Sequence, residues 1–317
     1  MIRVLDMFCG AGGSSAGARA AGVEVVAGID MCAIATETFA ANFPRAQAIT
    51  SRLEHVSLCT LKKQIGEIDL LLASPECTSH TCAKGAAPRD EASRATAMLV
   101  VEYARVLRPR WLVLENVIHM RPWSRYGELK RDLRELGYHL EEHVLDASDF
   151  GVAQTRRRLF LLGDRKEKPP RAVSKRPGRR KSAKAILDPA GTWTTSPLFD
   201  RRRADATLER ARRGFQALGE EASFLLVYYG SDGSGGWQPL SRPLRTITTI
   251  DRFALVEHDG NAPRIRMLQV PELKRAMGFD EDFSLPVGTR RERIRLLGNG
   301  VCPPVMDAVV RALACGQ

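Results

Sequence analysis

The chain has 317 residues, of which 44% are hydrophobic, enough to bury a large core in one or two domains. No apolar run is long enough to span a membrane, and the first residues have the pattern of a strand instead of a signal peptide. We therefore expect neither a membrane protein nor a secreted one. The seven cysteines are scattered and odd in number, which argues against a disulfide framework and favours the reducing cytoplasm.

The net charge of +11 is concentrated in one part of the chain. Residues 1–150 hold 17 basic and 19 acidic side chains, whereas the remaining residues hold 31 basic and 18 acidic ones. This excess predicts that the second part binds a polyanion such as nucleic acid. The alternative is a basic surface that only keeps the protein soluble.

The first half of the chain alternates short apolar runs with stretches of helical periodicity. The apolar runs predict strands at 2–6, 23–29, 68–73 and 111–115. The periodic stretches predict helices at 13–21, 31–41, 91–107 and 125–136. This order is typical of βαβ units, so we expect an α/β fold with a doubly wound, mostly parallel sheet. Two further strands, near 139–146 and 158–163, flank Gly151 and would close the sheet as a hairpin.

The alternation then ends. Residues 165–184 carry ten Lys or Arg, one acid and three prolines, which is typical of an extended arm. Residues 185–262 are turn-rich, and periodicity in 306–315 predicts a last helix that returns to the first part of the fold. The predicted domains are therefore a main domain of 1–165 plus 286–317 and a second, smaller domain of 166–285.

A glycine-rich loop joins the first predicted strand to the first helix. Its residues are Phe8, Cys9, Gly10, Ala11, Gly12 and Gly13. Glycines let a backbone turn sharply and approach a ligand closely. The loop has neither the G-x-G-x-x-G pattern nor the Lys-Ser/Thr of a P-loop, which favours a nucleoside cofactor without phosphates over NAD or ATP. The second strand ends at Ile29 and Asp30, where an acid can bind ribose hydroxyls. The alternative is an ordinary tight turn.

Two other strand ends carry a thiol and a carboxyl group. Cys77 follows a buried strand and Pro75, a layout that presents a nucleophile at the carboxyl edge of a sheet. Glu115 ends the apolar run 111–114, in a partly apolar site where its pKa would rise and it would share a proton. A buried structural thiol and a helix-capping acid are the alternatives. We expect no metal site, because no second Cys/His pair accompanies Cys77, His80 and Cys82.

A third cluster is Gln154-Thr155-Arg156-Arg157-Arg158, before an apolar run. In a strand, Gln154, Arg156 and Arg158 share one face, which suits phosphate or base contacts. A solvated edge strand is the alternative.

The order of these motifs resembles that of the DNA (cytosine-5) methyltransferases, which use S-adenosylmethionine. The resemblance covers roughly 1–165 and 263–317. It rests on Asp6 to Gly13 (DMFCGAGG), Pro75-Glu76-Cys77, Glu115-Asn116-Val117, Gln154 to Arg158, Arg266 to Glu272 with Met277-Gly278-Phe279, and Gly298 to Val301. Residues 166–262 match no motif firmly, as a target-recognition region would. The resemblance implies a Rossmann-like methyltransferase fold with a smaller target-recognition domain.

The family mechanism would use the residues singled out above. A cytosine is flipped out of duplex DNA, Cys77 attacks its C6, and Glu115 bonds its N3/N4 edge. Arg158 would hold the O2 side and Arg156 would support the Cys77 loop. Asn299 would brace the domain junction and, with Val301, join the cofactor site. The product would be S-adenosylhomocysteine, and no metal is needed.

Three positions depart from the family pattern. The family has Pro-Cys-Gln, but here Glu76 precedes the cysteine. A carboxylate facing the thiol would raise the thiol pKa, so we expect Glu76 to point away. The ribose-binding Glu of the family falls on Gly28, which leaves Asp30 as the nearest acid, and the acid near the adenine falls on Ala48.

Sequence recognition must come from polar side chains that reach the groove edges of the duplex. The candidates in 185–262 are Arg242, Arg245, Thr246, Thr248, Thr249 and Arg252, beside a glycine-rich stretch at 230–236. The alternative is that 246–249 is simply a strand.

Three rival functions are weighed. The tRNA-modifying relatives carry Cys-Phe-Thr, which is absent here, and an amino-group methyltransferase needs a Pro-Pro-aromatic motif where Pro75-Glu76-Cys77 stands. A catalytically silent DNA-binding regulator is supported only by Glu76. We expect a monomer that acts on double-stranded DNA in the cytoplasm of a bacterial cell or phage-infected host. The recognition sequence and a partner restriction endonuclease stay open.

Overall fold

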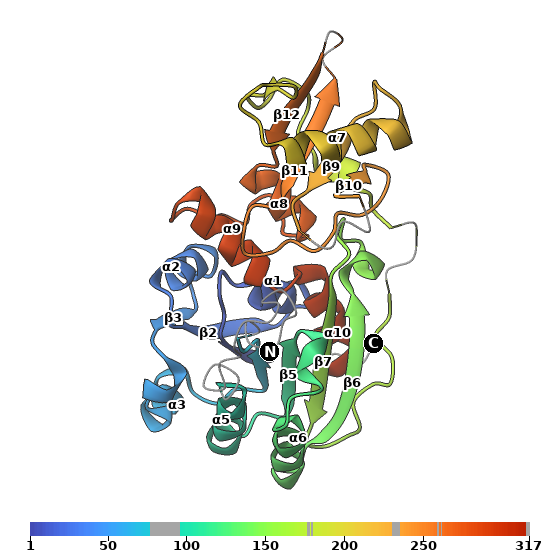
Figure 1. Ribbon diagram of the computed structural model, residues 1–317. Helices are drawn as coiled ribbons and strands as arrows, with labels where there is room; N and C mark the ends of the chain where they lie inside the picture. The colour runs from blue at the N-terminus through green and yellow to red at the C-terminus, as the bar shows by residue number, and fades with distance from the viewer. Residues whose placement is uncertain are drawn as a thin grey trace.

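The structure is a computed structural model that describes residues 1–76, 96–175, 178, 180–229, 235–258, 260 and 262–314. It contains a large sheet and a small sheet, one above the other in Figure 1. Within the described ranges, no helix combines the length and apolar character needed to cross a membrane.

The large sheet has seven strands in the order β3-β2-β1-β4-β5-β7-β6. The strands are β1 (Arg3–Met7), β2 (Glu24–Asp30), β3 (Gln47–Thr50), β4 (Leu70–Ala73), β5 (Trp111–Asn116), β6 (His139–Asp146) and β7 (Arg157–Asp164). The first five are parallel, and β7 pairs antiparallel with both β5 and β6. This confirms the predicted mostly parallel α/β sheet with its closing hairpin. The short edge strand β3 was not predicted.

Helices cover both faces of the large sheet, as a doubly wound fold requires. They are α1 (Gly13–Ala20), α2 (Ala33–Asn42), α3 (Leu58–Ile65), α5 (Leu99–Leu107), α6 (Tyr126–Glu135) and α10 (Pro303–Ala314). Alternate residues of β4 point to opposite faces. Leu70 and Leu72 share a core with α1, α2 and α10, whereas Leu71 shares one with α3, α5 and α6.

The small sheet is antiparallel, in the order β10-β9-β11-β12-β8. Its strands are β8 (Ser196–Pro197), β9 (Phe224–Val227), β10 (Trp237–Pro239), β11 (Phe253–His258) and β12 (Pro263–Met267). Helix α7 (Asp205–Leu218) covers one face, and a Cβ added at Gly214 would lie 2.3 Å from the Phe224 ring, so only glycine allows this close approach. The opposite face, with Leu225 and Phe253, joins a core cluster of the large sheet.

Helices α8 (Val270–Ala276) and α9 (Arg290–Asn299) connect the two sheets. Short 3-10 turns lie at Leu53–His55, Thr96–Met98, Ile118–Met120, Ala147–Phe150 and Ala183–Ile186. The predicted boundary at residue 285 stays a prediction. One residue before this boundary, the chain already contacts a helix of the large sheet. Asn42 of α2 and Ser284 exchange two hydrogen bonds of 2.9 and 2.8 Å.

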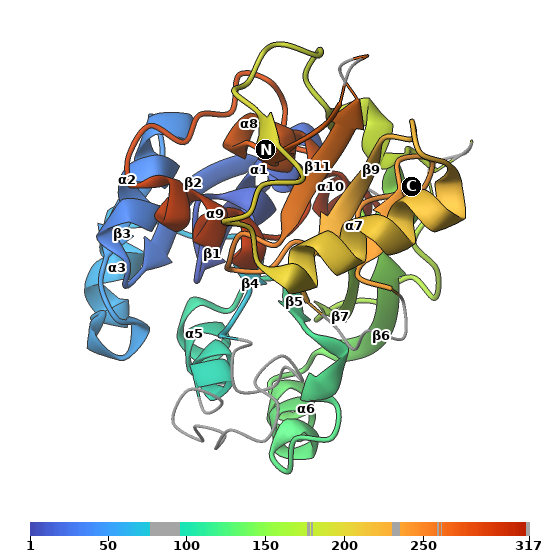
Figure 2. The ribbon, with the colours of Figure 1, turned by 45° about the horizontal axis from the view of Figure 1, so that its top comes forward.

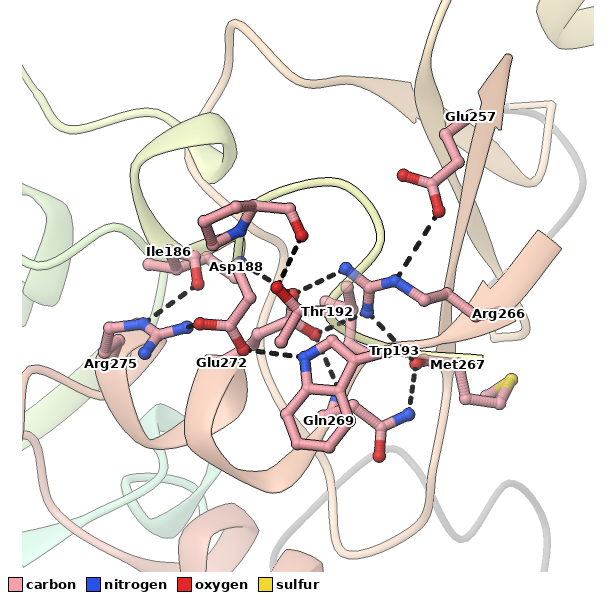
Figure 3. A network of polar contacts seen from close by, with 12 residues as sticks. Ile186, Asp188, Thr192, Trp193, Glu257, Arg266, Met267, Gln269, Glu272 and Arg275 are labelled. Atoms are coloured by element: carbon pink, nitrogen blue, oxygen red, sulfur yellow. Dashed lines mark hydrogen bonds and ion pairs between the residues drawn. The ribbon is translucent and has the colours of Figure 1, made fainter. Parts of the chain in front are cut away.

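A buried ion-pair network fixes α8 to the small sheet (Figure 3). Arg266 of β12 donates two hydrogen bonds of 2.7 Å to Glu272 of α8, and the two side chains are 4% and 0% exposed. Glu272 also accepts from the backbone N–H groups of Asp188 and Gln269. Arg275 pairs with Asp188. Buried charges need such pairing, so removing either Arg266 or Glu272 would leave an uncompensated charge at this junction.

The predicted arm has irregular backbone in its described residues up to Ser182, as expected. It runs beside β6 (Figure 1), where the Pro170 carbonyl lies 2.9 Å from the His143 ring nitrogen Nε2. Lys175 and Arg180 both pair with Asp149. The arm is therefore attached to the large sheet at its edge.

Candidate active site

A cavity of about 890 Å³ opens at the carboxyl ends of β1, β2, β4 and β5. This is the edge at which ligands bind in open parallel sheets. Residues of the β1–α1 loop, the β2–α2 turn and residues 74–76 form one wall, and α9 with residues 299–301 forms another. Figure 2 shows α9 beside β1 and β2, which brings the C-terminal part of the chain to the N-terminal loop.

The predicted glycine loop borders this cavity. Its backbone is sharply turned, with φ of 57° at Phe8, 53° at Gly10 and 97° at Gly12. A Cβ at Gly10 would meet nothing within 4 Å, whereas one at Gly12 would lie 2.5 Å from the Phe43 ring and one at Gly13 would lie 2.4 Å from the Val301 carbonyl oxygen. Gly10 is thus the glycine whose missing side chain leaves the cavity open.

The predicted cofactor residues separate into two groups. Those that line the cavity are Phe8, Gly10, Gly13, Asp30, Asn299 and Val301. Ala11, Gly12 and Ile29 are outside its lining and build the loop instead. The Ile29 carbonyl accepts a 3.0 Å hydrogen bond from the Cys9 N–H, which anchors the loop to the end of β2.

Asp30 holds the loop and faces the cavity at once. Its carboxylate accepts from the N–H groups of Gly10 at 3.0 Å and Cys32 at 2.9 Å. Burial raises its pKa, and the charge of Glu76 raises it further. A Cβ at Gly28 would lie 2.5 Å from the Phe39 ring, so a side chain there would enter the core. The departure at Gly28 therefore removes no group from the cavity, and Asp30 is the acid of this strand end that lines it.

A carboxyl group that the sequence analysis did not single out lies below the loop. Asp6 at the end of β1 is fully buried and accepts a 2.7 Å hydrogen bond from the Ser15 hydroxyl. Its other oxygen, Oδ1, has no hydrogen-bond partner among the described residues. Burial raises the pKa of Asp6 to about 7.

Glu115 and Arg158 meet at another part of the cavity. Glu115 is 6% exposed at the end of β5, and the Arg158 Nε lies 3.3 Å from its Oε1. Burial raises the pKa of Glu115, while Arg158 and Arg156 oppose that shift. The carboxyl group is therefore disposed to hold a proton beside a fixed guanidinium, in the direction that the sequence predicted.

Arg156 is a brace. Its buried guanidinium donates to the carbonyls of Ile247, Gly298 and Gly300 at 3.0, 2.7 and 2.9 Å. Gln154 adds a 2.8 Å bond from the Ile247 N–H. These contacts hold the segment before β11 against the α9–α10 junction. Asn299 lines the cavity at this junction, next to the braced carbonyls of Gly298 and Gly300.

The predicted nucleophile Cys77 lies outside the described residues, as do His80, Cys82 and the Cys77 loop that Arg156 is expected to support. The chain leading to it is described. The Asn116 side chain donates a 3.1 Å hydrogen bond to the Pro75 carbonyl, and Pro75 and Glu76 line the cavity. The expectation that Glu76 points away from the thiol stays a prediction, because Cys77 is not among the described residues. Glu76 is exposed, and its charge raises the pKa of Asp30.

The predicted DNA-reading side chains are mostly committed to backbone groups. Arg242 is exposed. The others donate to carbonyls: Arg245 to Trp237, Thr246 to Thr155, Thr248 to Ile250, and Arg252 to Tyr228. Thr249 is half-buried, and the alternative of a strand at 246–249 is wrong, because only Leu244 forms an isolated bridge there.

Several cavity residues were missed from the sequence. They are Ser14, Cys32, Ser51, Arg52, Leu53, Glu54, Arg295 and Leu296 among others. Those at 51–54 follow the unpredicted strand β3. Arg295 and Leu296 belong to α9, whose start carries a readable signal, the capping box of Thr289 and Glu292. In the part of the chain that the structure describes, no group of three or more His, Cys, Asp or Glu is placed to hold a metal ion.

Residues 2–315 match the family model for C-5 cytosine-specific DNA methylases. The chain belongs to this family. This membership places it among the DNA cytosine-5-methyltransferases, as the order of motifs predicted.

Individual relatives agree with this assignment. The type II methyltransferase M.AquIA of Picosynechococcus is 33% identical over 51% of this chain and 72% of its own length. M.HgiDI of Herpetosiphon aurantiacus is 31% identical, over about half of each chain, 52% and 52%. M.NlaX of Neisseria lactamica is 25% identical over 99% of this chain and 96% of its own. The chain is thus similar to several type II methyltransferases, over a part or nearly all of their length.

Two solved structures share the fold. One is described as a DNA modification methyltransferase encoded within a prophage of E. coli, with a TM-score of 0.72, 19% identity and 98% coverage of both chains. The other is the S. pombe Dnmt2 methyltransferase, with a TM-score of 0.73, 17% identity and coverage of 98% of this chain and 97% of that one. These likenesses support the methyltransferase fold along nearly the whole chain.

Proposed function

We propose that the protein transfers a methyl group from S-adenosylmethionine to C5 of cytosine within a specific sequence of duplex DNA, through a covalent bond between Cys77 and C6 of a flipped base. The observation that carries this proposal is the pair of the buried Glu115 and the half-buried Arg158, which shares one cavity with the glycine loop and the backbone that leads to Cys77. One cavity can then hold a nucleoside cofactor and a pyrimidine in contact.

The residues present fit the cofactor. The space beside Gly10, where a Cβ would meet no atom within 4 Å, admits a ligand against the backbone. Asp30 offers a carboxylate for the ribose hydroxyls, and Phe8, Leu296 and Val301 supply apolar walls. When bound, S-adenosylmethionine supplies an electrophilic methyl group on its sulfonium.

The pyrimidine is activated by the chain's own groups. Glu115, whose pKa is raised by burial, donates a proton to N3 of the ring while Arg158 holds O2. The ring then accepts the Cys77 thiolate at C6, which forms the S–C6 bond and moves electron density to C5. C5 takes the methyl group and S-adenosylhomocysteine is left, the C5 proton leaves to solvent, and N3 returns its proton to Glu115. Breaking of the S–C6 bond restores the double bond and the thiolate.

We propose that residues 166–285 supply target recognition. The basic excess lies mainly in the arm at 165–184, with ten Lys or Arg and one acid, and Arg156 and Gln154 tie the segment 244–248 to the cavity wall. Among the predicted contacts, Arg242 is the exposed one and the best placed to reach a groove edge.

The covalent step is tested with duplex DNA that carries 5-fluorocytosine at the target. Fluorine cannot leave C5 as a proton does, so the protein should stay bound to the DNA in the presence of S-adenosylmethionine, and peptide mapping should locate the adduct on Cys77. The Cys77→Ser variant should form none while still binding DNA. An adduct on Cys82, or methylation without any adduct, contradicts the mechanism.

A further inference from the structure

Among the described residues, four arginines line the cavity, and they differ in their partners. Arg52 pairs with Glu54 at 2.7 Å and Arg158 pairs with Glu115 at 3.3 Å. Arg156 is bonded to three carbonyls. Arg295 has no carboxylate within ion-pair distance in the described part of the chain, and its hydrogen-bond contact there is the Cys32 Sγ at 3.8 Å.

The fold explains why Arg295 stands in this wall. The capping box at Thr289 fixes the start of α9, and Leu296 and Leu297 bury the inner side of the helix. Arg295 and Asn299 are four residues apart, on one helical face, and both line the cavity. Arg291 is exposed on the same face one turn earlier but lies outside the cavity lining. Arg295 contacts Cys32, which follows Asp30 by two residues, so Arg295 lies near the end of β2.

Arg295 is exposed, and its charge also acts on Glu292 of the same helix, whose pKa it helps to lower. The remaining charges of the cavity make a cation without a close carboxylate informative. Asp30, Glu54, Glu76 and Glu115 all line it, so an anionic ligand group would be repelled unless a cation receives it. S-adenosylmethionine has a single anionic group, the carboxylate of its methionine end. A guanidinium binds a carboxylate through two parallel N–H donors.

We propose that Arg295 binds the methionine carboxylate of S-adenosylmethionine. The proposal rests on the proposed function, because it names the residue that receives one end of that cofactor. It assigns Arg295 a binding role that none of the sequence motifs indicated.

The experiment is calorimetric titration without DNA. Two ligands are compared, S-adenosylhomocysteine and its decarboxylated analogue, which lacks only the carboxylate. Binding of S-adenosylhomocysteine to Arg295→Gln should be about tenfold weaker than to the parent, as expected for a charge-assisted bond in a partly open site. The analogue should bind both proteins equally. Arg291→Gln, the matched control on the same face, should leave both affinities unchanged.

Each other result has a definite meaning. If Arg295→Gln weakens the binding of both ligands equally, the proposal is overturned in favour of a structural role. The melting temperature of the variant should then be lower than that of the parent. If the variant binds S-adenosylhomocysteine as tightly as the parent but binds duplex DNA more weakly, the proposal is overturned in favour of a contact between Arg295 and a DNA phosphate. If the parent protein binds no S-adenosylhomocysteine in the first titration, the proposed function itself fails, before any variant is measured.

Discussion

The strand ends of the large sheet and the segment before β11 contrast in how they use polar side chains. At the strand ends, Asp30 and Glu115 face a cavity, and Asp30 at the same time accepts two N–H groups of its own loop. In the segment 242–252, Arg245, Thr246 and Arg252 donate to backbone carbonyls. Irregular backbone has no ladder to satisfy its polar groups, so nearby side chains do so. Polar residues therefore indicate chemistry more reliably at a parallel strand end than in an irregular connection.

The largest effect should come from Glu115. Glu115→Gln keeps the shape of the side chain but cannot transfer a proton to the base, so we expect the methylation rate to fall by about 10²–10⁴-fold. Binding of S-adenosylhomocysteine should not change. A rate within a factor of two of the parent would show that Glu115 takes no part in the reaction. It would also contradict the view that polar residues at a parallel strand end indicate chemistry.

The pH dependence sharpens the same assignment. The pKa of Glu115 is raised by burial, so its protonated form persists to higher pH than that of an exposed glutamate. If the proton is needed, kcat/KM should decline as pH rises through this raised pKa. The decline should be absent from the residual activity of Glu115→Gln. The measurement is a pH–rate profile of both proteins at saturating cofactor.

The next effect distinguishes two glycines of one loop. Gly10→Val places a side chain in open cavity space, so binding of S-adenosylhomocysteine should weaken about tenfold or more. The φ of 53° at Gly10 strains any side chain, so the melting temperature should also fall, but no clash adds to this loss. Gly12→Val instead drives a side chain into Phe43, 2.5 Å from the Cβ position, and should lower the melting temperature further. Calorimetry and thermal melts separate the two. Equal loss of affinity at unchanged stability in both variants contradicts the described geometry.

A smaller effect tests the small-sheet side of the comparison. Arg242→Ala should relax the methylated sequence at one position, by about 1–3 kcal/mol for a base contact. Arg245→Ala should mainly lower stability, because it removes a donor from the Trp237 carbonyl. Sequencing of methylated sites and chemical unfolding measure the two outcomes. Relaxed specificity in Arg245→Ala with full stability would show that its side chain leaves the backbone to reach DNA.

The last effect concerns Asp6, which lies near the end of β1. Its pKa is about 7 in the folded protein and 3.8 in its ordinary state, so the folded protein binds more protons between these values. Stability must then decrease as pH rises from about 4 to 7 and level off above it. Asp6→Asn should remove this part of the pH dependence. Urea unfolding at pH 5 and pH 8 measures it, and an unchanged difference between the two pH values in the variant refutes the assignment.

Much of the large-sheet fold was predictable from local pattern. The apolar runs that became β1, β2, β4 and β5 are fully or largely buried, so hydrophobicity marks them clearly. Strand β3 was missed because it has four residues at an edge and is only half-buried. Helix α7 was missed although its residues favour helix, because the surrounding turn-rich composition dominated the interpretation.

The site was predictable where function needs a strand end or a special backbone. Gly10, Asp30 and Glu115 belong to that group. Arg295 was not predictable in this way, since it reaches the cavity only because α9 lies beside the turn after β2, where Arg295 contacts Cys32. Contacts between segments so distant in sequence depend on tertiary packing, which local periodicity does not report.

The most direct measurement is bisulfite sequencing of DNA from cells that express the protein. The account predicts that cytosines become resistant to conversion at one short sequence motif and that Cys77→Ser, expressed to the same level, leaves the same cytosines unprotected. Protection in the Cys77→Ser cells would contradict the nucleophile. The absence of any protected cytosine in DNA, with a folded protein that binds S-adenosylhomocysteine, would contradict the proposed methylation of DNA.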